Sequence, residues 1–130
     1  MTRSNAVTRG IRVEVRARYL PERSDVDAGT WVFAYHVRIT NESARVVQLV
    51  SRRWVITDAD GSQEIVEGPG VVGEQPILGP GESHEYTSFC PLGTSFGSME
   101  GAYRMVPRDG ADPFDAVVAP FSLAEPFSIN

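Results

Sequence analysis

Hydrophobic and polar side chains alternate along most of this chain, which predicts β-strands and not helices. The clearest alternation runs over residues 11–19, where apolar residues at odd positions face mostly charged residues at even positions. Residues 31–40 repeat the pattern with aromatic residues on the apolar face, which predicts a central strand. A third strand is predicted over residues 46–57, where the alternation slips at residues 50–53. Such a slip indicates a β-bulge or a change of sheet.

The rest of the chain predicts shorter strands between turns. Strands are expected at residues 63–67, 77–78, 83–90 and 96–106, and as short pieces at sheet edges between residues 114 and 127, with turns at 58–61, 79–82 and 108–110. In the strand at 83–90 we place Tyr86 and Ser88 on the face opposite His84. Residues 1–6 are expected to be a flexible N-terminus ahead of a single domain over residues 7–130.

About seven or eight strands without an amphipathic helix predict an all-β fold, an antiparallel β-sandwich with Greek-key connections. A small barrel is the alternative. The length of 130 residues and the 42% hydrophobic content fit one such domain. The cysteine pair of an immunoglobulin domain is missing, because Cys90 is the only cysteine. The fibronectin type III-like variant of the sandwich therefore fits better.

The charge of the chain limits its partners. It carries 12 basic and 17 acidic residues, a net charge of -5 at pH 7, which opposes non-specific attachment to nucleic acid or to an anionic membrane. The arginines on the polar face of residues 11–19 are interrupted by Glu14, and such a face is typical of a solvated strand. The sequence shows no signal-peptide pattern and no apolar run of about 18 residues. We expect a cytoplasmic protein that binds no nucleic acid and does not insert into a membrane.

Residues 68–76, the glycine loop, form the most conspicuous motif. Residues 68–73 match the G-x-G-x-x-G fingerprint of dinucleotide-binding loops, which requires a helix to begin at the third glycine. Gln75-Pro76 occupies the place of that helix, so we expect a loop with positive φ at one or more glycines and with Val71-Val72 packed on the core. An anion-binding nest of loop amides is the alternative, although the acidic residues on both sides oppose it.

Metal binding is weakly indicated. Asp58, Asp60 and Glu64 could form an oxygen site for a hard cation, but a solvated acidic hairpin is the favoured interpretation. His36 and His84 show no ligand spacing, so no metal site is predicted.

Catalysis is not indicated either. Cys90 and Ser88 lie near His84 in sequence, yet the sequence offers no nucleophile and base with a third group to orient them. Pro91 after the cysteine suggests a structural turn. We predict no catalytic residue and no cofactor.

Several motifs closely resemble the ApaG family over about residues 7–130. The residues that carry the resemblance are Arg53-Trp54-x-Ile56-x-Asp58, Gly68-x-Gly70-Val71-Val72-Gly73-x-Gln75-Pro76-x-Leu78, Tyr86-Thr87-Ser88, Cys90-Pro91-Leu92, Gly97-x-Met99-x-Gly101-x-Tyr103-x-Met105 and Phe121-x-Leu123-x-x-Pro126. The resemblance implies an immunoglobulin or fibronectin type III-like sandwich without established catalytic residues. It also implies a link to cobalt resistance and magnesium efflux in bacteria, and protein binding in eukaryotic fusion proteins.

We therefore predict a non-catalytic protein-binding module whose partner is a protein. The predicted binding surface consists of Gly68, Gly70, Val71, Val72, Gly73, Gln75, Pro76, Arg53 and Trp54. The alternative is a small-ligand binder that takes a divalent cation or a phosphate or pyrophosphate anion at the glycine loop. A homodimer through an exposed edge strand is a further possibility.

Overall fold

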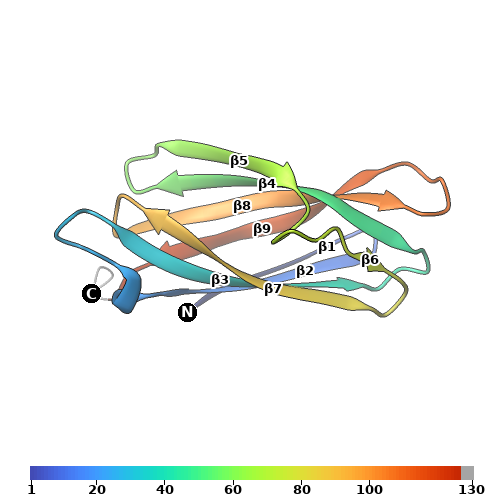
Figure 1. The fold of residues 1–130 in the computed structure, drawn as a ribbon, viewed down its shortest axis with the longest axis horizontal. Helices are drawn as coiled ribbons and strands as arrows, with labels where there is room; N and C mark the ends of the chain where they lie inside the picture. Colours follow the sequence, from blue (N-terminus) through green and yellow to red (C-terminus); the bar gives the residue numbers. More distant parts are fainter. Residues whose placement is uncertain (127–130) are drawn as a thin grey trace.

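The computed structural model describes residues 1–126, which form two antiparallel β-sheets packed face to face (Figure 1). The first sheet has the order β1-β2-β3-β7, with bounds Thr2–Thr8, Ile11–Tyr19, Trp31–Asn41 and Ser83–Leu92. The second has the order β5-β4-β8-β9, with bounds Gln63–Pro69, Val47–Asp58, Phe96–Pro107 and Phe114–Ala124, and β6 (Ile77–Leu78) also pairs with β4. A short 3-10 helix, η1 (Pro21–Arg23), follows β2. The predicted all-β sandwich is confirmed.

The core lies between the sheets because alternation brings one apolar face of each long strand inward. Aromatic rings from both sheets meet at its centre. Trp54 is edge-on to Tyr35, with 5.3 Å between ring centroids, and the rings of Tyr103 and Phe121 each lie 6.0 Å from it. Burying one aromatic side chain of this kind contributes about 2 to 3 kcal/mol to folding. This cluster fixes how the two sheets face each other.

The predicted bulge in β4 is confirmed. Pairing between β4 and β8 shifts between Leu49 and Ser51, which leaves Val50 without a partner in β8. Leu49 is buried before the shift, and Trp54 is buried after it. The bulge therefore moves the inward face from odd to even positions, and Arg52 lies on the same face as Trp54.

The expectation that residues 1–6 are flexible is wrong. Thr2–Thr8 form the edge strand β1, which pairs with β2 along its whole length. The Val117 amide of β9 also donates to Thr8 Oγ1 at 3.0 Å. Backbone hydrogen bonds hold this strand, and a hydrophobic pattern could not reveal them because the segment carries few large apolar residues.

The strand near the C-terminus is also longer than expected. β9 is one edge strand of 11 residues and not several short pieces. Pro120 fits inside it because pairing with β8 shifts between Met99 and Gly101, and a bulge at a sheet edge tolerates a proline. With β1, this brings the strands within residues 1–126 to nine. Phe127, which we expected in the tail, lies outside the described residues.

Candidate functional site

The glycine loop connects β5 to β6 through a small hairpin. Val72 and Gly73 have φ values of 47° and 80°. The Val71 amide donates to the Glu74 carbonyl at 2.8 Å, and the Glu74 amide donates to the Val71 carbonyl at 3.0 Å. Positive φ at both central residues is the signature of a type I′ turn. No helix begins at the third glycine, so the helix that a dinucleotide fingerprint needs is missing from this loop.

Gly70 shows why the loop needs glycine. Its φ is 60°, and a Cβ on it would lie 2.2 Å from the carbonyl oxygen of Glu74. Its amide donates to the carbonyl of Val50, the bulge residue of β4, at 2.9 Å. Gly73 has a positive φ as well, but a Cβ there would meet open space. The predicted positive φ is confirmed, and Gly70 is the position where it coincides with close packing.

Arg52, on the inner face of β4, stabilises the loop through hydrogen bonds. Its Nη1 donates to the carbonyls of Pro69 and Gly70, both at 3.0 Å. Gly68 makes room for the guanidinium, since a Cβ there would lie 3.0 Å from Nη1. Arg52 was not among the residues predicted from the sequence. The available signal was an arginine two residues before the aromatic Trp54, on the same strand face.

The bulge in β4 provides a second attachment point for the loop. The Gln75 side-chain amide donates to the Val50 carbonyl at 2.8 Å, and the Leu49 amide donates to the Pro76 carbonyl at 3.0 Å. The bulge leaves Val50 outside the β4–β8 ladder, and its carbonyl accepts bonds from the loop. Strand and loop therefore form one hydrogen-bonded unit.

The two valines of the loop have opposite environments. Val71 is buried in the core with 1% exposure, whereas Val72 is 66% exposed at the tip of the turn. The expectation that both pack on the core is therefore wrong for Val72. A type I′ turn projects its central residues away from the residues that flank it, so only one of the pair can face inward.

Of Arg53 and Trp54, only Arg53 shares a surface with the glycine loop, where it lines a hollow together with Gly68. Trp54 is 2% exposed and belongs to the aromatic centre of the core. Arg53 lies on the outer face of β4 and forms an exposed ion pair with Glu67, with 3.5 Å between Nε and Oε1. Adjacent residues of a strand point to opposite faces, so the predicted binding role of Trp54 is corrected to a packing role.

The acidic hairpin is confirmed as a turn. Asp58 Oδ1 accepts hydrogen bonds from the amides of Asp60 and Ser62 at 2.9 and 3.0 Å, and Gly61 has a φ of 84°. The carboxylate is thus a turn cap. Within residues 1–126, no group of three or more His, Cys, Asp and Glu side chains could hold a metal ion, and Glu64 is exposed.

The inner face of β7 carries the residues that we weighed for catalysis. His84, Ser88 and Cys90 lie on one face together with Tyr86, which corrects our placement of His84 opposite Tyr86 and Ser88. Cys90 is 2% exposed, and burial raises the pKa of its thiol to about 12. A protonated, inaccessible thiol is a poor nucleophile. The His84 imidazole instead faces Glu74 of the glycine loop at 3.5 Å.

Tyrosines fill the space beside Arg52. The hydroxyls of Tyr86 and Tyr103 share a hydrogen bond, and burial raises the pKa of both side chains. The positive charge of Arg52 acts in the opposite direction on both, but less than burial does.

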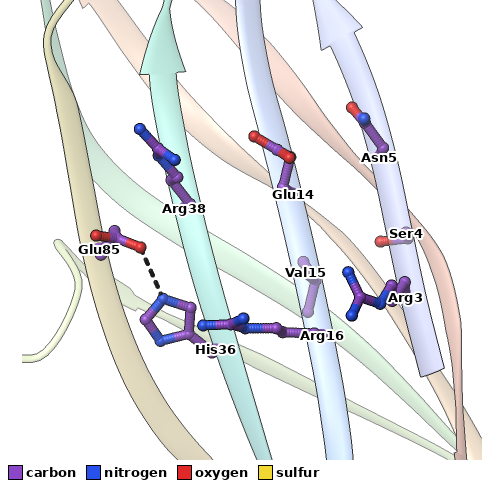
Figure 2. Close-up of a pocket in the computed structure, with 9 residues that line it drawn as sticks. All are labelled: Arg3, Ser4, Asn5, Glu14, Val15, Arg16, His36, Arg38 and Glu85. Atoms are coloured by element: carbon purple, nitrogen blue, oxygen red, sulfur yellow. Dashed lines mark hydrogen bonds and ion pairs between the residues drawn. The ribbon is translucent and has the colours of Figure 1, made fainter. Parts of the chain in front are cut away.

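A hollow that the sequence analysis missed lies on the outer face of the four-stranded sheet (Figure 2). It has a volume of about 490 Å³, and its charged and titratable lining residues are Arg3, Glu14, Arg16, His36, Arg38 and Glu85. A hydrogen bond of 3.0 Å joins His36 Nε2 to Glu85 Oε1. The pKa of Glu85 is lowered, first by that hydrogen bond and then by the positive charges of His36, Arg38 and Arg16. The sequence signal was the arginine-rich polar face of residues 11–19.

Comparison with known proteins decides the family. The ApaG domain family matches residues 21–107. The chain belongs to the ApaG family. The protein ApaG of Anaeromyxobacter sp. (strain K) is 57% identical over 127 residues, which cover 98% of this chain and 99% of that protein. The protein ApaG of Beijerinckia indica subsp. indica is 52% identical over 124 residues, 95% of each chain.

A solved ApaG-family structure has the same fold. The crystal structure of an ApaA protein from Bordetella pertussis matches with a TM-score of 0.86 at 49% identity, and the match covers 89% of this chain and 94% of that one. The resemblance inferred from the motifs is thereby confirmed. As for membranes, none of the helices within residues 1–126 has the length and apolar character to cross one.

Proposed function

We propose that this ApaG-family chain is a non-catalytic protein-binding module that captures its partner with the glycine loop. The observation that carries the proposal is the exposed apolar tip: Val72 is 66% exposed, and its backbone is held in the left-handed conformation. A loop that is already ordered loses little conformational entropy on binding. A rigid valine at the tip of such a loop suits an apolar pocket on a partner protein.

The polar groups of the loop support a protein partner over a phosphate anion. The amides of Gly70, Val71 and Glu74 donate to carbonyls of the chain itself, and the carbonyls of Pro69 and Gly70 accept from Arg52. Few loop amides remain for an anion, and the carboxylate of Glu74 lies beside the turn. An apolar contact needs no free donor, so the braced loop remains suitable for protein recognition.

Capture of proteins from the native host tests the proposal. The wild-type chain, Val72→Asp and the control Val117→Asp would be immobilised, and the retained proteins would be identified. Val117 is 47% exposed on β9, so its variant adds the same charge to another exposed valine. We expect a specific protein to be retained by wild type and Val117→Asp and lost with Val72→Asp. Equal retention by Val72→Asp, or no specific protein at all, contradicts the proposal.

A small-ligand role at the loop is the second candidate. The feature that favours a divalent cation is the pairing of the exposed Glu74 carboxylate with His84 at 3.5 Å, since carboxylate and imidazole are both metal ligands. Calorimetric titration with magnesium, cobalt, ATP and pyrophosphate separates the two candidates. Magnesium or cobalt heat that disappears in a Glu74→Gln variant would favour the ligand role, and no heat with either cation up to about millimolar concentration would remove it.

The role in cobalt resistance and magnesium efflux that the family resemblance implies is part of the proposal. A non-catalytic chain of this kind would act on ion transport through the protein it binds, and we place that encounter in the cytoplasm. The identity of the captured protein tests this step, because a component of an ion-transport system is the expected result.

A further inference from the structure

We propose that the outer face of the four-stranded sheet binds the phosphate group of a small anionic ligand between Arg3, Arg16 and His36. The site lies on β1, β2 and β3 (Figure 2), whereas the glycine loop connects strands that pair in the other sheet. The inference therefore goes beyond the protein-binding role and does not depend on it.

The strand register places positive charges opposite each other. Arg3 of β1 is the partner of Arg16 in β2, and Arg16 is in turn the partner of His36 in β3. Side chains in such positions have Cβ atoms about 5 Å apart, and like charges directly opposite each other destabilise a sheet. This row of cross-strand partners, Arg3, Arg16 and His36, ends at Thr87 of β7, whose Oγ1 lies 2.9 Å from His36 Nδ1. None of the four residues in the row is a carboxylate.

The neighbouring row of the sheet is different. There Arg38 has Glu14 as its partner in β2 and Glu85 as its partner in β7. Figure 2 shows the Arg38 side chain between these two carboxylates. Glu85 also bonds to His36 and interacts with Arg16, so three arginines and His36 share two carboxylates in this hollow, and positive charge remains in excess.

Ion pairs elsewhere on the surface make the contrast clear. Within residues 1–126, four other arginines each pair with a carboxylate: Arg12, Arg45, Arg53 and Arg104. Arg3, Arg16 and Arg18 have no such pair in the same part of the chain. Within the same residues, Arg9, Arg52 and Arg108 also lack a carboxylate pair but lie apart from this face, which gathers three unpaired arginines although the whole chain has a net charge of -5.

A second hollow extends the positive surface. It has a volume of about 450 Å³, shares Arg16 and His36 with the first, and adds Arg18, Glu22 and Arg23. The two hollows together are lined by five arginines and three glutamates, so this face is positive even with His36 neutral. Each hollow is within the usual range for small-molecule sites, about 300–1,000 Å³.

The residue type favours phosphate. All 12 basic residues of the chain are arginine. A guanidinium presents a planar fork of donors that binds phosphate oxygens in pairs, and two forks on adjacent strands can grip one tetrahedral dianion. His36 is held in a fixed orientation by Thr87 and Glu85 and borders the same position. Nucleic acid does not fit, because the net charge of the whole chain is negative.

Titration with pyrophosphate, followed by amide NMR shifts, tests the proposal. We expect shifts concentrated on β1, β2 and β3 near Arg3, Arg16 and His36, and at least about tenfold weaker affinity in Arg16→Gln. The matched control is Arg104→Gln, which removes an exposed arginine paired with Asp115 on the other sheet and is expected to leave affinity within about twofold of wild type.

A charge reversal separates loss of the site from loss of the fold. Arg16→Glu places an acidic group opposite Arg3, so we expect an unchanged or slightly higher unfolding temperature, by about 1 to 3 °C, together with loss of pyrophosphate binding. Wild-type pyrophosphate affinity in Arg16→Gln or Arg16→Glu overturns the proposal, as do shifts centred on the glycine loop. Tighter binding of a hexaglutamate peptide than of pyrophosphate also overturns it, in favour of an acidic protein partner.

Discussion

Gly70 is the loop residue with the least freedom to change. A methyl group there would sit 2.2 Å from the Glu74 carbonyl oxygen in a left-handed backbone, whereas at Gly73 it would meet open space at a similar φ. We expect Gly70→Ala to lower the free energy of unfolding by about 3 kcal/mol and Gly73→Ala by about 1 kcal/mol. Urea unfolding measures both. Equal losses would mean that conformation alone, without packing, sets the requirement for glycine.

Cys90 predicts a pH dependence of stability. Burial raises its pKa to about 12 from an ordinary value of 9.0, so the thiol stays protonated in the folded chain while the unfolded chain ionises above pH 9. Its contribution to stability is therefore complete below pH 9 and is lost as the pH rises toward 12. Between pH 8 and pH 10 the loss should be about 1 kcal/mol.

Urea unfolding of wild type and Cys90→Ala at pH 8 and pH 10 measures this effect. The variant is expected to be less stable at both pH values but to lose less stability between them, because it lacks the thiol. Tyrosines in the unfolded chain are half ionised at about pH 10, but both proteins contain them, so they lower both stabilities alike. Parallel losses in the two proteins would show that the thiol is not the cause.

At the scale of strands, periodicity predicted what depends on burial. β2 and β3 were predicted nearly residue for residue because each has one buried face, and the slip in β4 correctly indicated the bulge after Leu49. β1 was not predicted because it carries few large apolar side chains and is held by backbone pairing with β2. A hydrophobic pattern indicates which residues are buried, and it does not reveal edge strands that are held by hydrogen bonds.

The candidate site was only partly predictable for a related reason. The glycines showed that residues 68–76 form a tight loop, since positive φ is a local property. Arg52 and the positive row of Arg3, Arg16 and His36 depend on register between strands distant in sequence. A single sequence does not give the register, so these contacts could not be inferred.

At the scale of the whole molecule, the two sides of the sandwich are closed differently. On one side the edge strands β1 and β9 are joined directly, as the bond from the Val117 amide to Thr8 shows. On the other side the glycine loop crosses from the end of β5 towards β7 (Figure 1), buries Val71 and brings Glu74 to His84. The loop is thus a structural closure as well as the proposed binding surface.

Arg52 should hold that closure in place, and its neighbour in sequence provides the control. Arg52→Gln removes the donor to the carbonyls of Pro69 and Gly70, whereas Arg53→Gln removes only an exposed ion pair on the outer face. We expect Arg52→Gln to lower the free energy of unfolding by about 1 to 3 kcal/mol, and Arg53→Gln to change it by less than about 0.5 kcal/mol.

Hydrogen exchange distinguishes local opening of the loop from general loss of stability. In Arg52→Gln the amides of Gly70 and Glu74 should exchange at least about tenfold faster than in wild type. The exchange rates of the amides of β2 and β3 should rise only by the amount that the loss of global stability explains. Partner capture through Val72 should weaken in the same variant, because an opened loop must be ordered again on binding. If the loop amides exchange alike in Arg52→Gln and Arg53→Gln, the bulge contacts of Val50 hold the loop without the arginine.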